Sequence, residues 1–117
     1  MPTVTLYHNP RCSKSRQALQ LLQDNQVEPQ VRLYLDNPPS RAELETLLTQ
    51  LGIDPRELMR QGEAEYQDNN LGDGALSDAQ LLDALVRFPR LIERPIAIVG
   101  DRAVIGRPPE KVLELLG

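Results

Sequence analysis

The stretch "VTLYHNPRCSKSRQALQLL", residues 4–22, predicts a strand, a short loop and a helix in succession. Val4–Tyr7 is a β-prone run, and the turn formers at 8–10 end it. Residues 13–25 then hold helix formers, and their apolar positions share one face: Ala18, Leu19 and Leu22. Cys12, which is the only cysteine of the chain, therefore falls where the helix begins.

The segments that follow extend this α/β order. The alternating Val31, Leu33 and Leu35 predict a second strand. Near the end of the chain, Ile96–Val99 and Ala103–Ile105 read as a hairpin across Gly100-Asp101. Pro108-Pro109 then introduce a last helix with Val112, Leu113 and Leu116 on it. The order is βαβ followed by ββα, which is typical of a thioredoxin-like fold with a mixed four-stranded sheet.

A helical block, approximately residues 40–88, separates these two halves. Ser40–Glu43 and Ser77–Gln80 match capping boxes, and Gly52 ends the first helix. Between them, Asp54 and Pro55 begin a short helix that is expected to carry Met59 and Arg60. The later helix is expected to bury Leu81, Leu82, Leu85 and Val86. The sequence predicts one domain, 1–117, with this block as an insertion.

The composition narrows the class of protein. The chain has 117 residues, 40% of them hydrophobic, which suffices for a packed core. A net charge of −4 and scarce aromatic residues disfavour nucleic acid and anionic membranes as partners. One cysteine excludes an intrachain disulfide and fits the reducing cytoplasm. The sequence shows neither a signal peptide nor a run of transmembrane length.

The surroundings of Cys12 favour a thiolate. Unpaired backbone N–H groups and the helix dipole stabilise an anion at a helix start. Arg11, Lys14 and Arg16 add positive charge, and the first acidic residue is Asp24. The same field would attract an anionic substrate. The alternative is an inert cysteine buried between strand and helix.

Two neighbours of Cys12 have more than one reading. Ser15 takes the place of the second cysteine in a C-x-x-C motif, so an external thiol, such as glutathione, must release any Cys12 adduct. Its hydroxyl either donates to the thiolate or faces solvent. His8, if protonated, would stabilise the thiolate; if neutral, it could relay a proton; otherwise it caps the strand. One cysteine and one histidine cannot form the usual zinc site.

The motifs "YHNPRCSKSR", "ELMRQ", "ERPI" and "IGRPPE" together resemble the glutaredoxin-coupled arsenate reductases, which have a thioredoxin-like fold. The resemblance extends from Val4 to the last helix. It is strongest to a short subgroup that lacks a C-terminal tail.

The resemblance implies a role for particular residues. The family's nucleophile falls on Cys12, and its three oxyanion-binding arginines fall on Arg60, Arg94 and Arg107. The histidine that helps to ionise the cysteine falls on His8, with Ser15 and Arg16 as supporting residues. Pro95 occupies the place of the fold's cis-proline, which implies a cis Arg94–Pro95 bond.

The implied reaction is the reduction of arsenate or a similar oxyanion in the cytoplasm. Cys12 attacks arsenate, glutathione acts as co-substrate, and glutaredoxin resolves the resulting mixed disulfide. The resemblance implies no bound cofactor and no metal.

Three other functions remain open from the sequence. A general glutathione-dependent thiol oxidoreductase would use the same cysteine without arsenate. A regulator that binds RNA polymerase, of the Spx type, shares the fold but commonly has a C-x-x-C switch, which Ser15 interrupts. An inert structural domain would bury Cys12.

Overall fold

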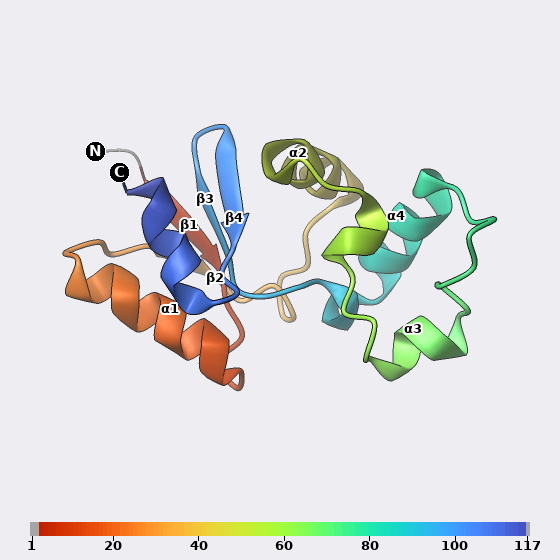
Figure 1. Cartoon of the computed structure of the whole chain (residues 1–117), viewed down its shortest axis with the longest axis horizontal. Coiled ribbons are helices and arrows are strands. Elements are labelled where there is room, and N and C mark those ends of the chain that lie inside the picture. Colours follow the sequence, from red (N-terminus) through yellow and green to blue (C-terminus); the bar gives the residue numbers. More distant parts are fainter. Residues whose placement is uncertain (1–2, 117) are drawn as a thin grey trace. The chain divides into compact units, whose positions relative to one another are not determined.

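The computed structural model describes residues 3–116 and divides them into two compact units. Residues 3–37 and 94–116 form the first, and residues 38–93 form the second (Figure 1). The predicted insertion, 40–88, falls within the second unit. Met1, Pro2 and Gly117, which the predicted domain 1–117 also includes, lie outside the described residues. The organisation as one domain stays a prediction.

The first unit contains a mixed four-stranded sheet with the strand order β2-β1-β3-β4. The strands are β1 (Val4–Tyr7), β2 (Gln30–Arg32), β3 (Ile96–Val99) and β4 (Arg102–Ile105). β1 is parallel to β2, whereas β1 with β3 and β3 with β4 are antiparallel. α1 (Ser13–Asp24) connects β1 to β2, and the 3₁₀ helix η3 (Pro109–Leu115) follows β4. This is the βαβ and ββα plan of the predicted thioredoxin-like fold.

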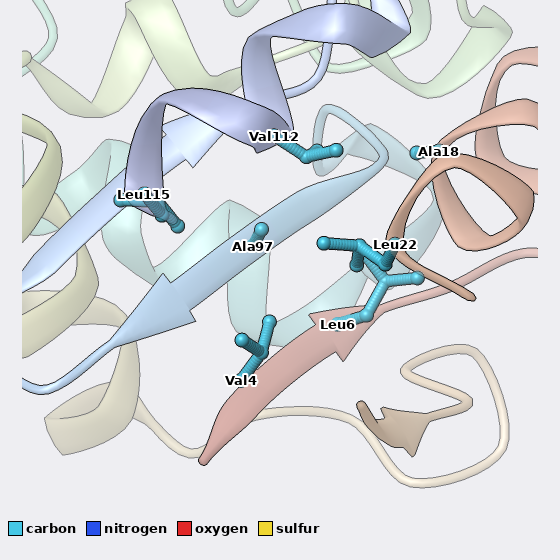
Figure 2. Packing of buried hydrophobic residues seen from close by; sticks show 7 residues of the cluster. All are labelled: Val4, Leu6, Ala18, Leu22, Ala97, Val112 and Leu115. Atoms are coloured by element: carbon cyan, nitrogen blue, oxygen red, sulfur yellow. The ribbon is translucent and has the colours of Figure 1, made fainter. Parts of the chain in front are cut away.

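The core of the first unit lies between the sheet and the two helices that cover one of its faces (Figure 2). Alternate residues of β1 point into it because successive side chains of a strand face opposite sides. The buried cluster consists of Val4, Leu6, Ala18, Leu22, Ala97, Val112 and Leu115. This packing holds β1 against α1, and the segment that joins them contains Cys12.

The second predicted strand is shorter than the alternation suggested. β2 ends at Arg32, and the carbonyl of Leu33 accepts bonds from the N–H groups of Asp36 and Asn37, so the chain turns there. Val31, Leu33 and Leu35 are exposed, whereas Tyr34 is buried and stacks on Tyr7 with ring centroids 6.3 Å apart. β2 is an edge strand, and the aromatic pair, not the aliphatic alternation, provides the burial here.

The last helix is a 3₁₀ helix, and this winding determines which of its residues face the core. A 3₁₀ helix has three residues per turn, so positions three apart share a face. Val112 and Leu115 are therefore buried, whereas Leu116, which the sequence placed on this helix, lies beyond it and is exposed.

The second unit is helical. It comprises α2 (Arg41–Leu51), η1 (Pro55–Leu58), α3 (Ala64–Asp68), α4 (Asp78–Arg87) and η2 (Pro89–Leu91). Both predicted capping boxes are present, and Gly52 ends α2 in the left-handed conformation at φ 69°. On α4, Leu81, Leu82 and Leu85 are buried as predicted. Val86, which was also predicted to be buried, is exposed, and Ala84 is buried instead. The sequence analysis did not predict α3.

Arg60 was expected on the short helix, and this prediction is wrong. η1 ends at Leu58, and the chain then runs extended beside the segment that follows η2. Met59 pairs with Ile92, and the Arg60 N–H donates to the Leu91 carbonyl over 2.6 Å. Arg60 is thus held by main-chain pairing rather than by a helical turn.

Within residues 3–116, no helix combines the length and the apolar character that crossing a bilayer requires.

Candidate active site

The loop between β1 and α1 is built by its own hydrogen bonds. The Asn9 carbonyl accepts from the Cys12 N–H, and the Asn9 side-chain Oδ1 accepts from the Arg11 N–H, each over 3.0 Å. Arg16 reaches back from α1 and donates from Nη1 to the Pro10 carbonyl over 2.8 Å. The loop is therefore closed at three points, and it places Cys12 at the N-cap of α1.

Cys12 is a partly exposed thiol with a lowered pKa. Its burial raises the pKa, but other interactions outweigh this. The backbone N–H of Ser15, the charge and the hydrogen bond of Arg94, and the backbone N–H of Lys14 all stabilise the thiolate. The helix start thus has the effect that the sequence predicted, and the strongest cationic neighbour comes from far along the chain.

The side chain of Arg107 is bonded to the main chain of Arg94. The Arg107 Nε donates to the Arg94 carbonyl over 3.0 Å, and the Gly106 N–H donates to the Pro95 carbonyl over 2.8 Å. The Arg94–Pro95 peptide is cis, as predicted, and the Arg107–Pro108 peptide is cis as well. The structure therefore brings Arg94, Arg107 and Pro95 together in the unit that contains Cys12.

The environment of Arg94 is incomplete. Within the described part of the chain, its Nε is a buried side-chain nitrogen without a hydrogen-bond acceptor. A buried donor in this condition costs free energy that a bound acceptor would recover. An anion bound within hydrogen-bond distance of this nitrogen would supply that acceptor.

Ser15 faces neither the thiolate with its hydroxyl nor the solvent, so both readings of its side chain are wrong. It is 0% exposed, and its Oγ lies 2.6 Å from the His8 Nδ1. The N–H of Asn9 also donates to this oxygen, over 3.0 Å. Only the main chain of Ser15 acts on Cys12.

His8 is buried, with 6% of its surface exposed. Desolvation lowers its pKa, and the charge of Arg16 lowers it further. Both effects favour the neutral imidazole, so a histidine cation is not available to stabilise the thiolate near neutral pH. Arg16 therefore acts on the loop and on His8.

Arg60 belongs to the second unit and lies among carboxylates there. It forms ion pairs with Glu63 and, over 3.7 Å from Nε, with Glu93. Glu63 also pairs with Arg90 over 3.6 Å. All three residues that contact Arg60 or its partner come from the same unit, so its guanidinium is held in place within that unit.

The sequence analysis missed the residues that hold the predicted site residues in place, which are Asn9 at the Cys12 loop and Glu63 and Glu93 at Arg60. Asn9 has a local signal, since Asn before Pro favours a turn in which its side chain bonds to the backbone. Glu63 and Glu93 have none, because acidic residues are common throughout the chain. Among residues 3–116, no group of three or more His, Cys, Asp and Glu residues is arranged to hold a metal ion.

Comparison with known proteins supports a common origin over nearly the full length. Residues 7–115 match the model of the ArsC family. The chain is 54% identical to a protein of Escherichia coli K12 named "Uncharacterized protein YfgD", with 97% of each chain covered. It is 48% identical to a protein named "Arsenate reductase" from Haemophilus influenzae, which covers 97% of this chain and 99% of that one.

A solved structure of an arsenate reductase from Vibrio cholerae has the same fold. It superimposes with a TM-score of 0.94, at 49% sequence identity, over 97% of both chains.

Proposed function

Because this chain belongs to the ArsC family, we propose that it is a reductase that converts arsenate to arsenite, with the Cys12 thiolate as the attacking group. Two relatives that cover nearly the whole chain carry this activity in their names. The chain has one cysteine, so the proposal needs a mechanism with one protein thiol.

The observation that carries the proposal is Arg94, whose charge and hydrogen bond lower the pKa of Cys12 and whose buried Nε has no acceptor among the described residues. Attack by a thiolate on arsenate brings two anions together, which only nearby positive charge can offset. A planar guanidinium also matches the oxygens of an oxyanion in a bidentate way. The residue that stabilises the nucleophile is thus also equipped to bind the substrate.

The first step forms a bond between sulfur and arsenic. The Cys12 thiolate attacks the arsenic atom, and one arsenic–oxygen bond breaks. The leaving oxygen departs as water with protons that the arsenate carries. Arsenic stays pentavalent in this adduct.

The second step takes two electrons from thiols. A glutathione sulfur forms a disulfide bond with Cys12, and the arsenic–sulfur bond breaks with its electron pair left on arsenic. Arsenite leaves in the trivalent state with the thiol proton. Glutaredoxin then resolves the Cys12–glutathione disulfide by thiol exchange, since the chain has no second cysteine. The reducing cytoplasm supplies these thiols, and no cofactor bound to this chain is needed.

Two further arginines have proposed roles in substrate binding. Arg107 is tied to the Arg94 main chain and adds a second guanidinium from the same unit. Arg60 is assigned to the oxyanion by its motif, "ELMRQ", and its carboxylate partners restrict its side chain. The remaining candidate is His8, whose neutral form suits proton transfer or hydrogen bonding.

The direct test is arsenate-dependent NADPH consumption coupled through glutathione, glutaredoxin and glutathione reductase. We expect activity in the wild type and its loss in Cys12→Ser. Arg94→Ala should lose more than about tenfold in kcat/KM, because one well-placed donor is worth that much in a transition state. Arg102→Ala is the matched control, since this exposed arginine of β4 bonds to the Glu114 carbonyl.

Two outcomes would contradict the proposal. A wild type without arsenate-dependent turnover, but with Cys12 readily glutathionylated, would leave a general glutathione-dependent thiol oxidoreductase. Equal losses in Arg94→Ala and Arg102→Ala would remove the oxyanion role of Arg94.

A further inference from the structure

The contact between His8 and Ser15 restricts where the imidazole proton lies. Both side chains are buried, and Nδ1 and Oγ are 2.6 Å apart. At this distance one of the two atoms must carry the hydrogen that lies between them. The contact alone allows either direction of donation.

The main chain of Asn9 decides the direction. Its N–H donates to the Ser15 Oγ over 3.0 Å and occupies one lone pair of that oxygen. A serine hydroxyl has a single proton to give. Within residues 3–116, the two bonds to His8 and Asn9 are the only hydrogen bonds of this hydroxyl. A buried hydroxyl whose proton found no acceptor would be costly, so the proton goes to His8 Nδ1.

We propose that Ser15 is a positioning residue that holds His8 as the neutral tautomer with its proton on Nε2. His8 then takes part in the reaction as a hydrogen-bond donor, and not as the base that ionises Cys12. The second statement rests on the proposed function, whereas the tautomer does not. Burial and the Arg16 charge both lower the pKa of His8, in agreement with a neutral ring.

The consequence for the thiol is that it needs no base on this chain. In the assigned tautomer, Nδ1 is occupied by Ser15 and Nε2 already carries a proton, so neither nitrogen can accept the thiol proton. The interactions that favour the thiolate are the N–H groups of Ser15 and Lys14 and the guanidinium of Arg94. Cys12 therefore loses its proton to solvent, and the positive surroundings keep it ionised.

The tautomer can be measured directly, because the chain has only one histidine. In the wild type labelled with ¹⁵N-histidine, long-range ¹⁵N–¹H correlation at neutral pH should show a protonated Nε2 and an unprotonated Nδ1. A protonated Nδ1, or an imidazolium with both nitrogens protonated, would overturn the proposal. This measurement uses no substrate and no variant.

Ser15→Ala tests the role of the hydroxyl. We expect the Nδ1 signal to lose its hydrogen-bonded shift and kcat for arsenate to fall by about tenfold or more, with KM changed by less than about twofold. The pH profile of Cys12 alkylation should stay in place, because the variant keeps the backbone N–H. Ser15→Thr keeps the hydroxyl and should restore the Nδ1 signal. Ser13→Ala, the same change at an exposed position of the same helical turn, is the control.

The outcomes separate this inference from the proposed function. A wild type with the expected tautomer and without arsenate turnover refutes the function and the catalytic role of His8, but confirms the tautomer. Turnover together with the opposite tautomer refutes the inference alone. An alkylation profile that moves to higher pH in Ser15→Ala would show that the hydroxyl acts on the thiolate, which also refutes it.

Discussion

The acidity of the Cys12 thiol depends on a few polar groups around one sulfur. Burial alone would make the thiol less acidic, and the lowered pKa results from the N–H groups at the helix start together with Arg94. The two contributions differ in kind. The N–H groups of Ser15 and Lys14 belong to the main chain and remain when a side chain is replaced, whereas the guanidinium is part of the Arg94 side chain. The part of the effect that substitution can remove is therefore the Arg94 charge.

Replacing Arg94 should make Cys12 less acidic. Without the guanidinium, the thiolate loses a charge and a hydrogen bond, so the pKa of Cys12 rises. We expect the midpoint of iodoacetamide alkylation against pH to move to higher pH in Arg94→Gln. The midpoint of Arg94→Lys, which keeps the charge, should lie between those of Arg94→Gln and the wild type. A midpoint that stays in place in Arg94→Gln would show that the helix start suffices.

The same ionisation should appear in the stability of the protein. The folded state lowers the pKa of Cys12, so at pH values between the folded and unfolded pKa the unfolded chain binds more protons. Stability must therefore rise with pH in that window, and the gain is complete above the unfolded value of about 8.5. Urea unfolding of the wild type and Cys12→Ser from pH 6 to about 9.5 should show a growing advantage for the wild type. An advantage that shrinks as pH rises would contradict the lowered pKa.

At the scale of elements, the local signals of the sequence were sufficient for most of the fold. The strand of Val4–Tyr7, the hairpin at Gly100 and both capping boxes are present because each depends on neighbouring residues only. The last helix carries Val112 and Leu113 as expected but ends before Leu116, because the end of a 3₁₀ helix could not be read from apolar spacing. The second strand was predicted too long, and Leu33 and Leu35 lie exposed beyond its end. Its place at the edge of the sheet depends on the other strands and could not be read locally.

The site follows the same division. The position of Cys12 at the helix start could be predicted, because the strand, loop and helix are contiguous. The bond between the Ser15 hydroxyl and His8 could not, since Ser15 is one helical turn beyond the cysteine that it was expected to serve. The carboxylates around Arg60 could not be found either, because Glu93 approaches it from a distant part of the sequence.

The turn that carries Arg107 depends on a glycine. A Cβ on Gly106 would lie 2.8 Å from Pro95 Cγ, closer than real contacts allow, and 3.0 Å from Val112 Cγ1, which is unusually tight. Gly106→Ala should therefore lower the free energy of unfolding by about 1–3 kcal/mol, as overpacking typically does. Urea denaturation measures this, and Gly62→Ala is the control because a Cβ there meets nothing within 4 Å. Equal stabilities of the two variants would mean that the turn adapts without cost.

At the scale of the whole molecule, the charge is divided unequally between the two units. The unit with Cys12 carries eight Lys and Arg against six Asp and Glu, a formal charge of +2. Residues 38–93 carry five against eleven, a formal charge of −6. An acidic protein can therefore present a cationic surrounding to an anion at Cys12, and the net charge of −4 conceals this.

Salt should reveal that surrounding. A positive field accelerates an anionic reagent relative to a neutral one of the same chemistry, and added salt screens the field. The ratio of iodoacetate to iodoacetamide alkylation rates at Cys12 should fall several-fold between about 10 mM and 500 mM NaCl. The ratio for free cysteine, measured in the same buffers, is the reference. A ratio for the protein that changes no more than the reference would contradict a cationic site.

The bond from Arg107 to the Arg94 carbonyl makes the two positions unequal in what their replacement disturbs. Any residue at position 94 still has that carbonyl, so the anchor of Arg107 survives an exchange at 94. An exchange at 107 removes both a guanidinium and the group that bonds to the neighbouring main chain. The dependence has one direction: an exchange at 94 removes the charge that lowers the pKa of Cys12 but leaves the acceptor of Arg107 in place, whereas an exchange at 107 removes the bond itself.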